Sequence, residues 1–130
     1  IDANKLVPGL EKEFSVLEKA FGCMAELKDL YDSWYANNAR DLISLYAIRT
    51  LFVCAQVQVA TCLLEQSLIA MGKLQELPED HFDAAYYKGK VAAAKYYCNN
   101  ILPNVVTLTQ VIKSSDLTVQ ECPEDALIVV

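Results

Sequence analysis

LISLYAIRTLFVCAQVQVATCLLEQSLIAM, residues 42 to 71, is the stretch that decides the fold. Its only charged side chains are Arg49 and Glu65. Apolar residues recur at helical spacing on two sides of the stretch: Leu45, Phe52, Val59 and Leu63 on one, and Leu51, Cys54, Val57, Leu64 and Leu68 on the other. A helix that is apolar nearly all round belongs at the centre of a bundle, so we expect a central helix from about Ala39 to Met71.

A membrane span is the competing interpretation of this stretch. Its uncharged run, Thr50–Leu64, has 15 residues and contains Gln56 and Gln58. A bilayer requires roughly 20 consecutive apolar residues. We therefore expect a bundle helix that ends near Gly72, and no membrane span.

The segment before this stretch carries one apolar stripe. From about Pro8 to Tyr35, apolar residues recur at intervals of three, four or seven, while charged residues stand between them. The stripe consists of Leu10, Phe14, Leu17, Phe21, Met24, Tyr31 and Trp34. This pattern predicts a first helix with one side in the core, followed by a break at Asn37-Asn38, where Asn38 or Asp41 can cap the next helix.

The segment after it shows a sustained heptad pattern. It runs from about Glu79 or Asp83 to Ile112 or Lys113. The apolar positions are Tyr87, Val91, Ala94, Cys98, Ile101, Val105, Leu108 and Ile112. Because Pro103 lacks an N–H to bond the Asn99 carbonyl, it should kink this third helix or divide it in two.

These elements predict an all-α fold in a single domain, residues 1–130. We expect an antiparallel bundle of three long helices, or four if Pro103 splits the last, because short connections at 37–41 and 72–80 make consecutive helices antiparallel neighbours. Periodicity stops after Lys113, which predicts an irregular tail over 114–130. Its final Ile128-Val129-Val130 suits either a packing arm or a short strand.

The charge balance excludes some partners. With 17 acidic residues against 11 basic ones, the net charge is −6. Nucleic-acid binding needs clustered Lys and Arg, and an anionic membrane surface would repel this balance. The five cysteines, Cys23, Cys54, Cys62, Cys98 and Cys122, form no Cys-x-x-Cys pair. We interpret them as reduced, core-filling thiols of a cytoplasmic protein.

No complete catalytic, cofactor or metal site is predicted. His81 is the single histidine and has no cysteine at metal-binding spacing. It lies near a helix start beside Asp80 and Asp83, where a capping or surface role is expected. The four glycines are isolated, so no phosphate-binding loop occurs.

Two groups of residues are candidates for an interface. Arg49 and Glu65 interrupt an apolar helix and, 16 residues apart, point to nearly opposite sides. Each anchors an interface or has a partner on a neighbouring helix. The second group is the one basic concentration, interleaved with aromatic residues: Tyr86, Tyr87, Lys88, Lys90 and Lys95. It suits a face that meets a phosphate or carboxylate, or an ordinary solvated face.

The block FDAAYYKGKVAAAKYY, residues 82 to 97, closes with Ile101-Leu102-Pro103. It resembles the C-terminal helical domain of large bacterial acyl-CoA dehydrogenases, in which an aromatic pair precedes Gly-Lys, small residues, a basic-aromatic-aromatic step and Leu-Pro. The matching positions are Tyr86, Tyr87, Lys90, Ala94, Lys95, Tyr96, Tyr97, Leu102 and Pro103. The central helix departs from that family, with Ala47 and no Trp after Trp34.

The resemblance implies a parent flavoprotein that binds FAD and oxidises acyl-CoA to 2-enoyl-CoA in fatty acid metabolism. No residue here matches the flavin-binding or base-bearing motifs of that family, so the implied role is non-catalytic packing against the catalytic domains or a second subunit of a homo-oligomer. The start at Ile1 suggests a C-terminal piece of a larger enzyme. The alternative function is a free-standing helical interaction module that binds a partner helix or subunit.

Overall fold

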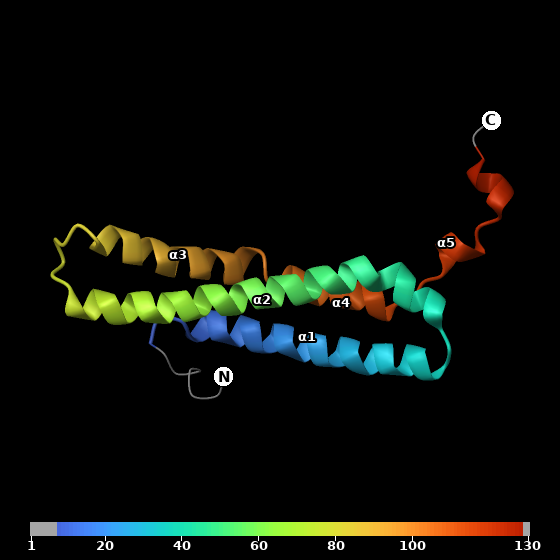
Figure 1. The fold of residues 1–130 in the computed structure, drawn as a ribbon, viewed down its shortest axis with the longest axis horizontal. Coiled ribbons are helices and arrows are strands. Elements are labelled where there is room, and N and C mark those ends of the chain that lie inside the picture. The colour runs from blue at the N-terminus through green and yellow to red at the C-terminus, as the bar shows by residue number, and fades with distance from the viewer. Residues whose placement is uncertain (1–7, 129–130) are drawn as a thin grey trace.

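The computed structural model describes residues 8–128, and within this range every regular element is helical. The elements are α1 (Glu11–Ala36), α2 (Arg40–Glu76), α3 (Ala84–Asn100), α4 (Asn104–Lys113), α5 (Thr118–Glu121) and a 3₁₀ turn, η2 (Glu124–Leu127). In Figure 1, α1 runs antiparallel to α2, and α3 and α4 follow one another back along α2. The all-α antiparallel bundle expected from the sequence is confirmed.

α1 buries the predicted stripe but begins later than expected. Phe14, Leu17 and Trp34 are buried. The helix starts at Glu11, not at Pro8, because Gly9 has a φ of +92°, which is incompatible with a helix. The Gly9 N–H donates to the Glu11 carboxylate at 3.0 Å, which closes this turn.

The break between α1 and α2 depends on the backbone of Asn38. This residue has a φ of 57°, the left-handed conformation that Asn tolerates better than most residues. This conformation lets the Ala39 N–H donate a hydrogen bond to the Trp34 carbonyl at 2.8 Å, so a carbonyl in the last turn of α1 has a partner. No side chain caps the start of α2, so the expected capping role of Asn38 or Asp41 is wrong.

α2 continues through Gly72 to Glu76, so the predicted end at Gly72 is also wrong. The half-buried Leu74 and Leu77 lie against the start of α3, and this packing favours the extra turn over a glycine stop. The helix ends where Pro78 forces Leu77 into an extended conformation, with ψ at 146°.

The third predicted helix is divided at Pro103 into α3 and α4. The heptad positions keep their register across the break. Ala94 and Cys98 on α3, and Val105 and Ile112 on α4, are completely buried. The missing N–H of Pro103 therefore breaks the helix without turning its apolar side away from the core.

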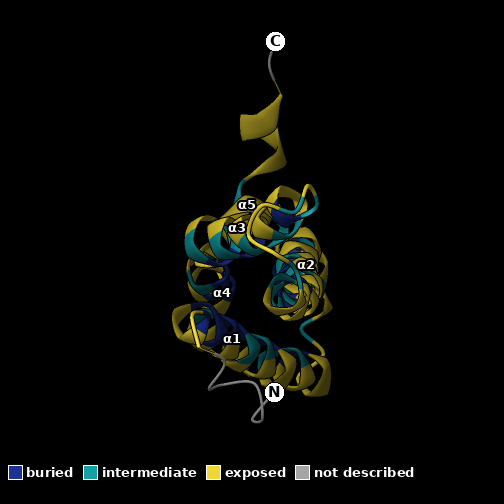
Figure 2. Cartoon of the chain, turned by 90° about the vertical axis from the view of Figure 1, so that its left-hand side faces the viewer, coloured by how far each residue is buried: buried dark blue, intermediate teal, exposed yellow. Residues whose placement is uncertain are grey.

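α2 contacts α1, α3 and α4, as expected of the central helix, but these helices do not enclose it. Its inner side packs against α1, α3 and α4 through Val53, Val57, Ala60 and Leu64, which are nearly inaccessible. Its outer side remains uncovered over the described residues, as the end-on view in Figure 2 shows. Three helices cover only part of the circumference of a fourth, so an apolar outer side stays exposed.

α2 is also the one helix within residues 8–128 that is long and apolar enough to cross a membrane, judged by length and composition. Such a helix alone is weak evidence, because the central helix of a bundle passes the same test. The packing of its inner side against three other helices is that of a bundle.

The tail after α4 leaves the bundle. Figure 1 shows α5 and the segment beyond it projecting away from the helices. One hydrogen bond fixes its root, since the Tyr46 hydroxyl on α2 donates to the Asp116 carbonyl at 3.0 Å. Ile128 is extended and exposed, whereas Val129 and Val130 lie outside the described residues, so the predicted arm or strand stays a prediction.

Candidate functional site

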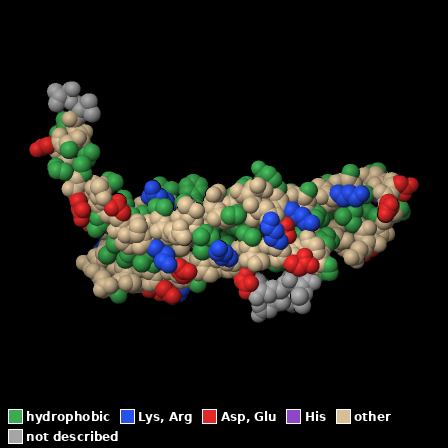
Figure 3. Space-filling view, turned by 180° about the vertical axis from the view of Figure 1, so that it is seen from behind, with side chains coloured by type: hydrophobic (Ala, Val, Ile, Leu, Met, Phe, Trp, Pro, Cys, Tyr) green, Lys and Arg blue, Asp and Glu red, His purple; other side chains and the backbone are tan. Residues whose placement is uncertain are grey.

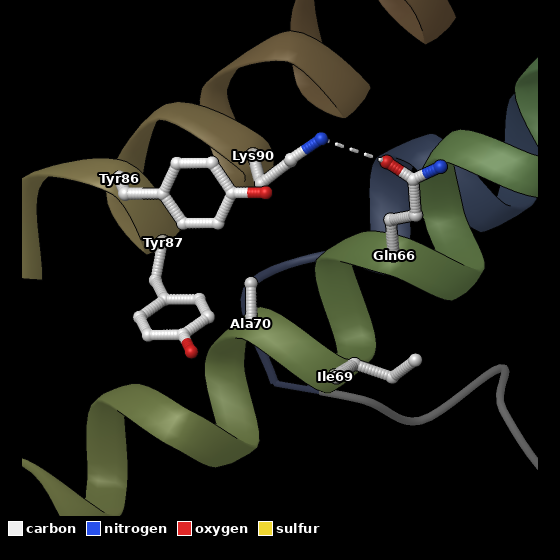
Figure 4. A pocket seen from close by; sticks show the side chains of 6 residues that line it. All are labelled: Gln66, Ile69, Ala70, Tyr86, Tyr87 and Lys90. Atoms are coloured by element: carbon white, nitrogen blue, oxygen red, sulfur yellow. Dashed lines mark hydrogen bonds between the residues drawn. The ribbon is translucent and has the colours of Figure 1, made fainter. Parts of the chain in front are cut away.

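Part of the predicted group of basic and aromatic residues lines one hollow between α2 and α3. Tyr86, Tyr87 and Lys90 of α3 line it together with Gln66, Ile69 and Ala70 of α2. Figure 4 shows the Tyr87 ring beside Ala70 and the Lys90 ammonium directed at the Gln66 amide. Lys90 donates to Gln66 Oε1 at 3.2 Å and lies 5.4 Å from the centre of the Tyr86 ring.

This hollow is small for a ligand site. Its volume is 210 Å³, whereas sites for small molecules usually enclose about 300–1,000 Å³. Its one cation, Lys90, already has a hydrogen-bond partner and an aromatic ring in contact. The arrangement fixes α3 against α2 and presents an exposed tyrosine, Tyr86, beside an exposed isoleucine, Ile69.

The other predicted interface residues lie apart from this hollow. Lys88 lines a separate hollow with Leu74 and Leu77, and Lys95 is half-buried further along α3. Arg49 and Glu65 are both exposed, and neither forms an ion pair within the described part of the chain. Arg49 lies 5.8 Å from the ring of Tyr46 on its own helix, so the expected partner on a neighbouring helix is not found there.

The sequence indicated apolar residues on two sides of α2, including Phe52 and Val59, but not that one complete row of them stays exposed. Seven residues follow one another at alternating steps of four and three, and all seven are exposed: Ile48, Phe52, Ala55, Val59, Cys62, Gln66 and Ile69. We call them the outer seam. The heptad spacing of the outer seam is present in the sequence. It was overlooked because the residues on the inner side of α2 have the same spacing, rotated around the helix.

The five cysteines differ in how far they are buried. Cys23 and Cys98 are buried and fill the core as expected, whereas Cys54 and Cys62 are exposed on α2. The prediction of core-filling thiols is therefore wrong for these two. Both cysteines lie on α2, which is apolar on its uncovered side as well. Apolar neighbours in the sequence therefore did not imply that these cysteines are buried.

The Cys98 thiol lies near the buried carboxylate of Glu13, and it is not an activated nucleophile. Burial, and to a smaller extent the negative charge of Glu13, together raise the pKa of Cys98 to about 11. Nucleophilic cysteines have a lowered pKa, because the thiolate is the reactive form. The pair therefore cannot act as a thiolate and its base.

Thiol labelling should separate the cysteines by burial. We expect Cys54 and Cys62 to react with iodoacetamide at pH 8 on the order of 100-fold faster than Cys98, because Cys98 is inaccessible and stays protonated. Peptide mapping after timed quenching measures each rate, and labelling in denaturant serves as the control. Equal rates in the folded chain would contradict the burial described here.

The raised pKa of Cys98 also predicts a pH dependence. In the unfolded chain this thiol ionises near its ordinary value of 9.0, whereas in the folded chain it ionises near 11. Between these values the unfolded state has lost the proton and the folded state has not, so the free energy of unfolding should fall as the pH rises. Urea unfolding at pH 8, 9 and 10 measures this, and a Cys98→Ala chain should show a weaker dependence.

His81 makes a local contact just before α3 but does not cap that helix, so the expected capping role is wrong. Its Nδ1 accepts a hydrogen bond from the Asp83 backbone N–H at 3.2 Å, and its ring stacks on Phe82 with the centroids 4.7 Å apart. Among the described residues, no three His, Cys, Asp or Glu side chains gather in a way that could hold a metal ion. Figure 3 shows basic side chains spread along one face and not gathered into a patch.

The architecture thus defines an antiparallel helical bundle whose notable surface is an apolar seam rather than a reactive cleft. A model of the family described as acetyl-CoA dehydrogenase C-terminal like matches residues 2–123. The chain belongs to this family, as the block at residues 82–97 implied.

Two curated relatives are both butyryl-CoA dehydrogenases of Syntrophomonas wolfei subsp. wolfei (strain DSM 2245B / Goettingen). One is 38% identical over 125 residues, which cover 96% of this chain and 20% of the relative. The other is 36% identical over 124 residues, which cover 95% of this chain and 20% of the relative. The chain therefore spans about a fifth of the length of these relatives.

Proposed function

We propose that this chain is the non-catalytic C-terminal accessory domain of an FAD-dependent acyl-CoA dehydrogenase. The observation that carries the proposal is the match to the C-terminal-like family over residues 2–123, together with similarity to one fifth of two butyryl-CoA dehydrogenases. The parent enzyme would oxidise an acyl-CoA to its 2-enoyl-CoA, a reaction of fatty acid metabolism, with FAD bound by its other domains.

The residues of this chain do not fit FAD. The glycines are isolated, so there is no glycine-rich turn for a pyrophosphate at a helix N-terminus. Five hollows described between the helices measure between 150 and 380 Å³, and each is lined by short stretches of two or three elements. The flavin and the catalytic base would therefore belong to the remainder of the parent, and we assign neither to a residue here.

The proposed role of the domain is packing against the catalytic domains or against a second subunit. An isolated domain rarely exposes a row of large apolar side chains without covering it in its assembly. On α2, Ile48 is 69% exposed and Ile69 is 66% exposed. The cytoplasm is the expected location, since the exposed thiols of Cys54 and Cys62 would stay reduced there.

Deletion of this domain from the full-length gene product tests the accessory role. We expect the truncated enzyme to keep its flavin and its rate of flavin reduction by acyl-CoA, and to lose thermal stability or subunit assembly, because the domain supplies packing and not chemistry. Stopped-flow reduction per bound flavin and sedimentation velocity measure the two effects. A truncated enzyme that keeps its flavin and assembly but loses reduction would refute the non-catalytic role.

A free-standing interaction module is the second candidate function, and the outer seam is the observation that favours it. It predicts a gene product about as long as this chain, whereas the first candidate predicts a product close in length to the two relatives. Mass spectrometry of the native gene product distinguishes them.

A further inference from the structure

The outer seam of α2 has the spacing by which one helix packs on another. Its seven residues alternate steps of four and three from Ile48 to Ile69, a span of about 32 Å along the helix. The same spacing on the inner side, at Val53, Val57, Ala60 and Leu64, is covered by the other helices of the bundle. A sustained seam of this kind is matched by a facing helix at a shallow crossing angle.

The charges around the seam define the chemistry of its partner. No charged residue occurs from Thr50 to Leu64, so the middle of the partner must be uncharged, because a buried charge facing it would have no counter-ion. Arg49 and Glu65 lie on opposite edges of the seam, and both are exposed. The partner helix should therefore carry an acidic residue beside Arg49 and a basic residue beside Glu65.

The area of the seam favours a tethered partner over a free one. A strip about 32 Å long and one helix diameter wide, about 11 Å, covers about 350 Å² on each side. That is well below the ~800 Å² per partner of stable free complexes, but twice this area falls in the range of interfaces between domains of one chain. A tether makes such a small interface stable, because it raises the effective concentration of the partner.

We propose that the outer seam docks on a helical surface in the remainder of the same polypeptide, and that the middle of this surface is uncharged. The proposal rests on the proposed function only for the existence of that remainder, which forms most of the length of both relatives. Tyr86 of α3 extends the docking surface, since it lines the same hollow as Ile69 and Gln66. Arg49 and Glu65 act at its edges.

Thiol labelling on the native protein tests the proposal without any substitution. Cys62 lies in the middle of the outer seam, and Cys54 is exposed on the same helix but lines a hollow on the α1 side. We expect iodoacetamide to label Cys62 at least about tenfold more slowly in the full-length product than in the 130-residue chain, in proportion to the docked fraction. Cys54 should react at the same rate in both. Equal Cys62 rates, or an equal slowing of both thiols, would overturn the assignment of the seam.

A matched pair of variants provides a second test. Val59 on the seam and Val111 on α4 are both helical valines, 42% and 40% exposed. In the full-length product, Val59→Lys should raise the labelling rate of Cys62 to about its rate in the 130-residue chain. Val111→Lys should leave the labelling rate of Cys62 unchanged. In the 130-residue chain, both variants should unfold at the same temperature as the unsubstituted chain. Slow Cys62 labelling in full-length Val59→Lys would contradict the proposal.

Other occupants of the seam give different results. Slow Cys62 labelling in the 130-residue chain that depends on protein concentration would assign the seam to a second copy and overturn the proposal. Protection of Cys62 in that chain by phosphatidylcholine vesicles would assign it to a lipid surface and also overturn it. Flavin content distinguishes a failure of the proposed function from a failure of the docking proposal. A protected Cys62 in a full-length product without flavin refutes the proposed function alone. A reactive Cys62 in a full-length flavoprotein refutes the docking alone. A gene product no longer than this chain would overturn both.

Discussion

Replacing Trp34 by alanine should lower the free energy of unfolding by about 3–5 kcal/mol, the largest effect that we expect from one substitution. Trp34 is 5% exposed and stacks on Tyr46 of α2 with the ring centroids 5.9 Å apart. Its carbonyl also accepts the Ala39 N–H that closes the turn between α1 and α2. Because small domains are stable by only about 5–15 kcal/mol, much of the stability should be lost.

Urea unfolding followed by circular dichroism measures this change, and the adjacent residue provides the control. Tyr35 is 75% exposed, so Tyr35→Ala should change the free energy of unfolding by no more than about 0.5 kcal/mol. A loss below about 1 kcal/mol for Trp34→Ala would show that the described packing between α1 and α2 is not the one in solution.

Replacing Asn99 by alanine should lower the free energy of unfolding by about 1.5–3 kcal/mol, the usual contribution of a hydrogen bond to a charged group. The Asn99 Nδ2 group donates to Glu13 Oε1 at 2.8 Å and thereby joins the end of α3 to the start of α1. Glu13 is only 6% exposed. Removal of the amide leaves a buried carboxylate without this donor, which is more costly than removal of an exposed bond.

The neighbouring Asn100 gives a matched control, since its amide donates to the Tyr96 carbonyl on its own helix at 2.9 Å and the residue is exposed. Asn100→Ala should therefore have a small effect. A double variant, Glu13→Met with Asn99→Leu, should recover much of the loss, because it removes both partners at once. If the effects of Glu13→Met alone and Asn99→Leu alone simply added in that double variant, the pairing of Asn99 with Glu13 would be refuted.

Much of the fold could be predicted because local patterns decide it. The stripe on α1, the heptad register of α3 and α4, and the break at Pro103 all follow from spacing within one segment. The helix ends were less predictable. At Gly72 a nearby glycine suggested a stop, but packing by Leu74 and Leu77 carried α2 one turn further.

The candidate site was less accessible to sequence reasoning. Periodicity shows that α2 is apolar on both sides, but not which side its neighbours cover, because that depends on how many helices the chain supplies. The exposure of Cys54 and Cys62 follows from the same cause. The role of the basic and aromatic residues of α3 at an interface stays a prediction, as does that of Arg49 and Glu65.

The visible spectrum of the full-length gene product, recorded during titration with butyryl-CoA, tests the central claim most directly. If this chain is the accessory domain of an acyl-CoA dehydrogenase, the product will show flavin absorbance that bleaches on addition of a butyryl-CoA or a related acyl-CoA, while the 130-residue chain alone will show neither. A colourless full-length product, or a flavin that no acyl-CoA reduces, would contradict the account.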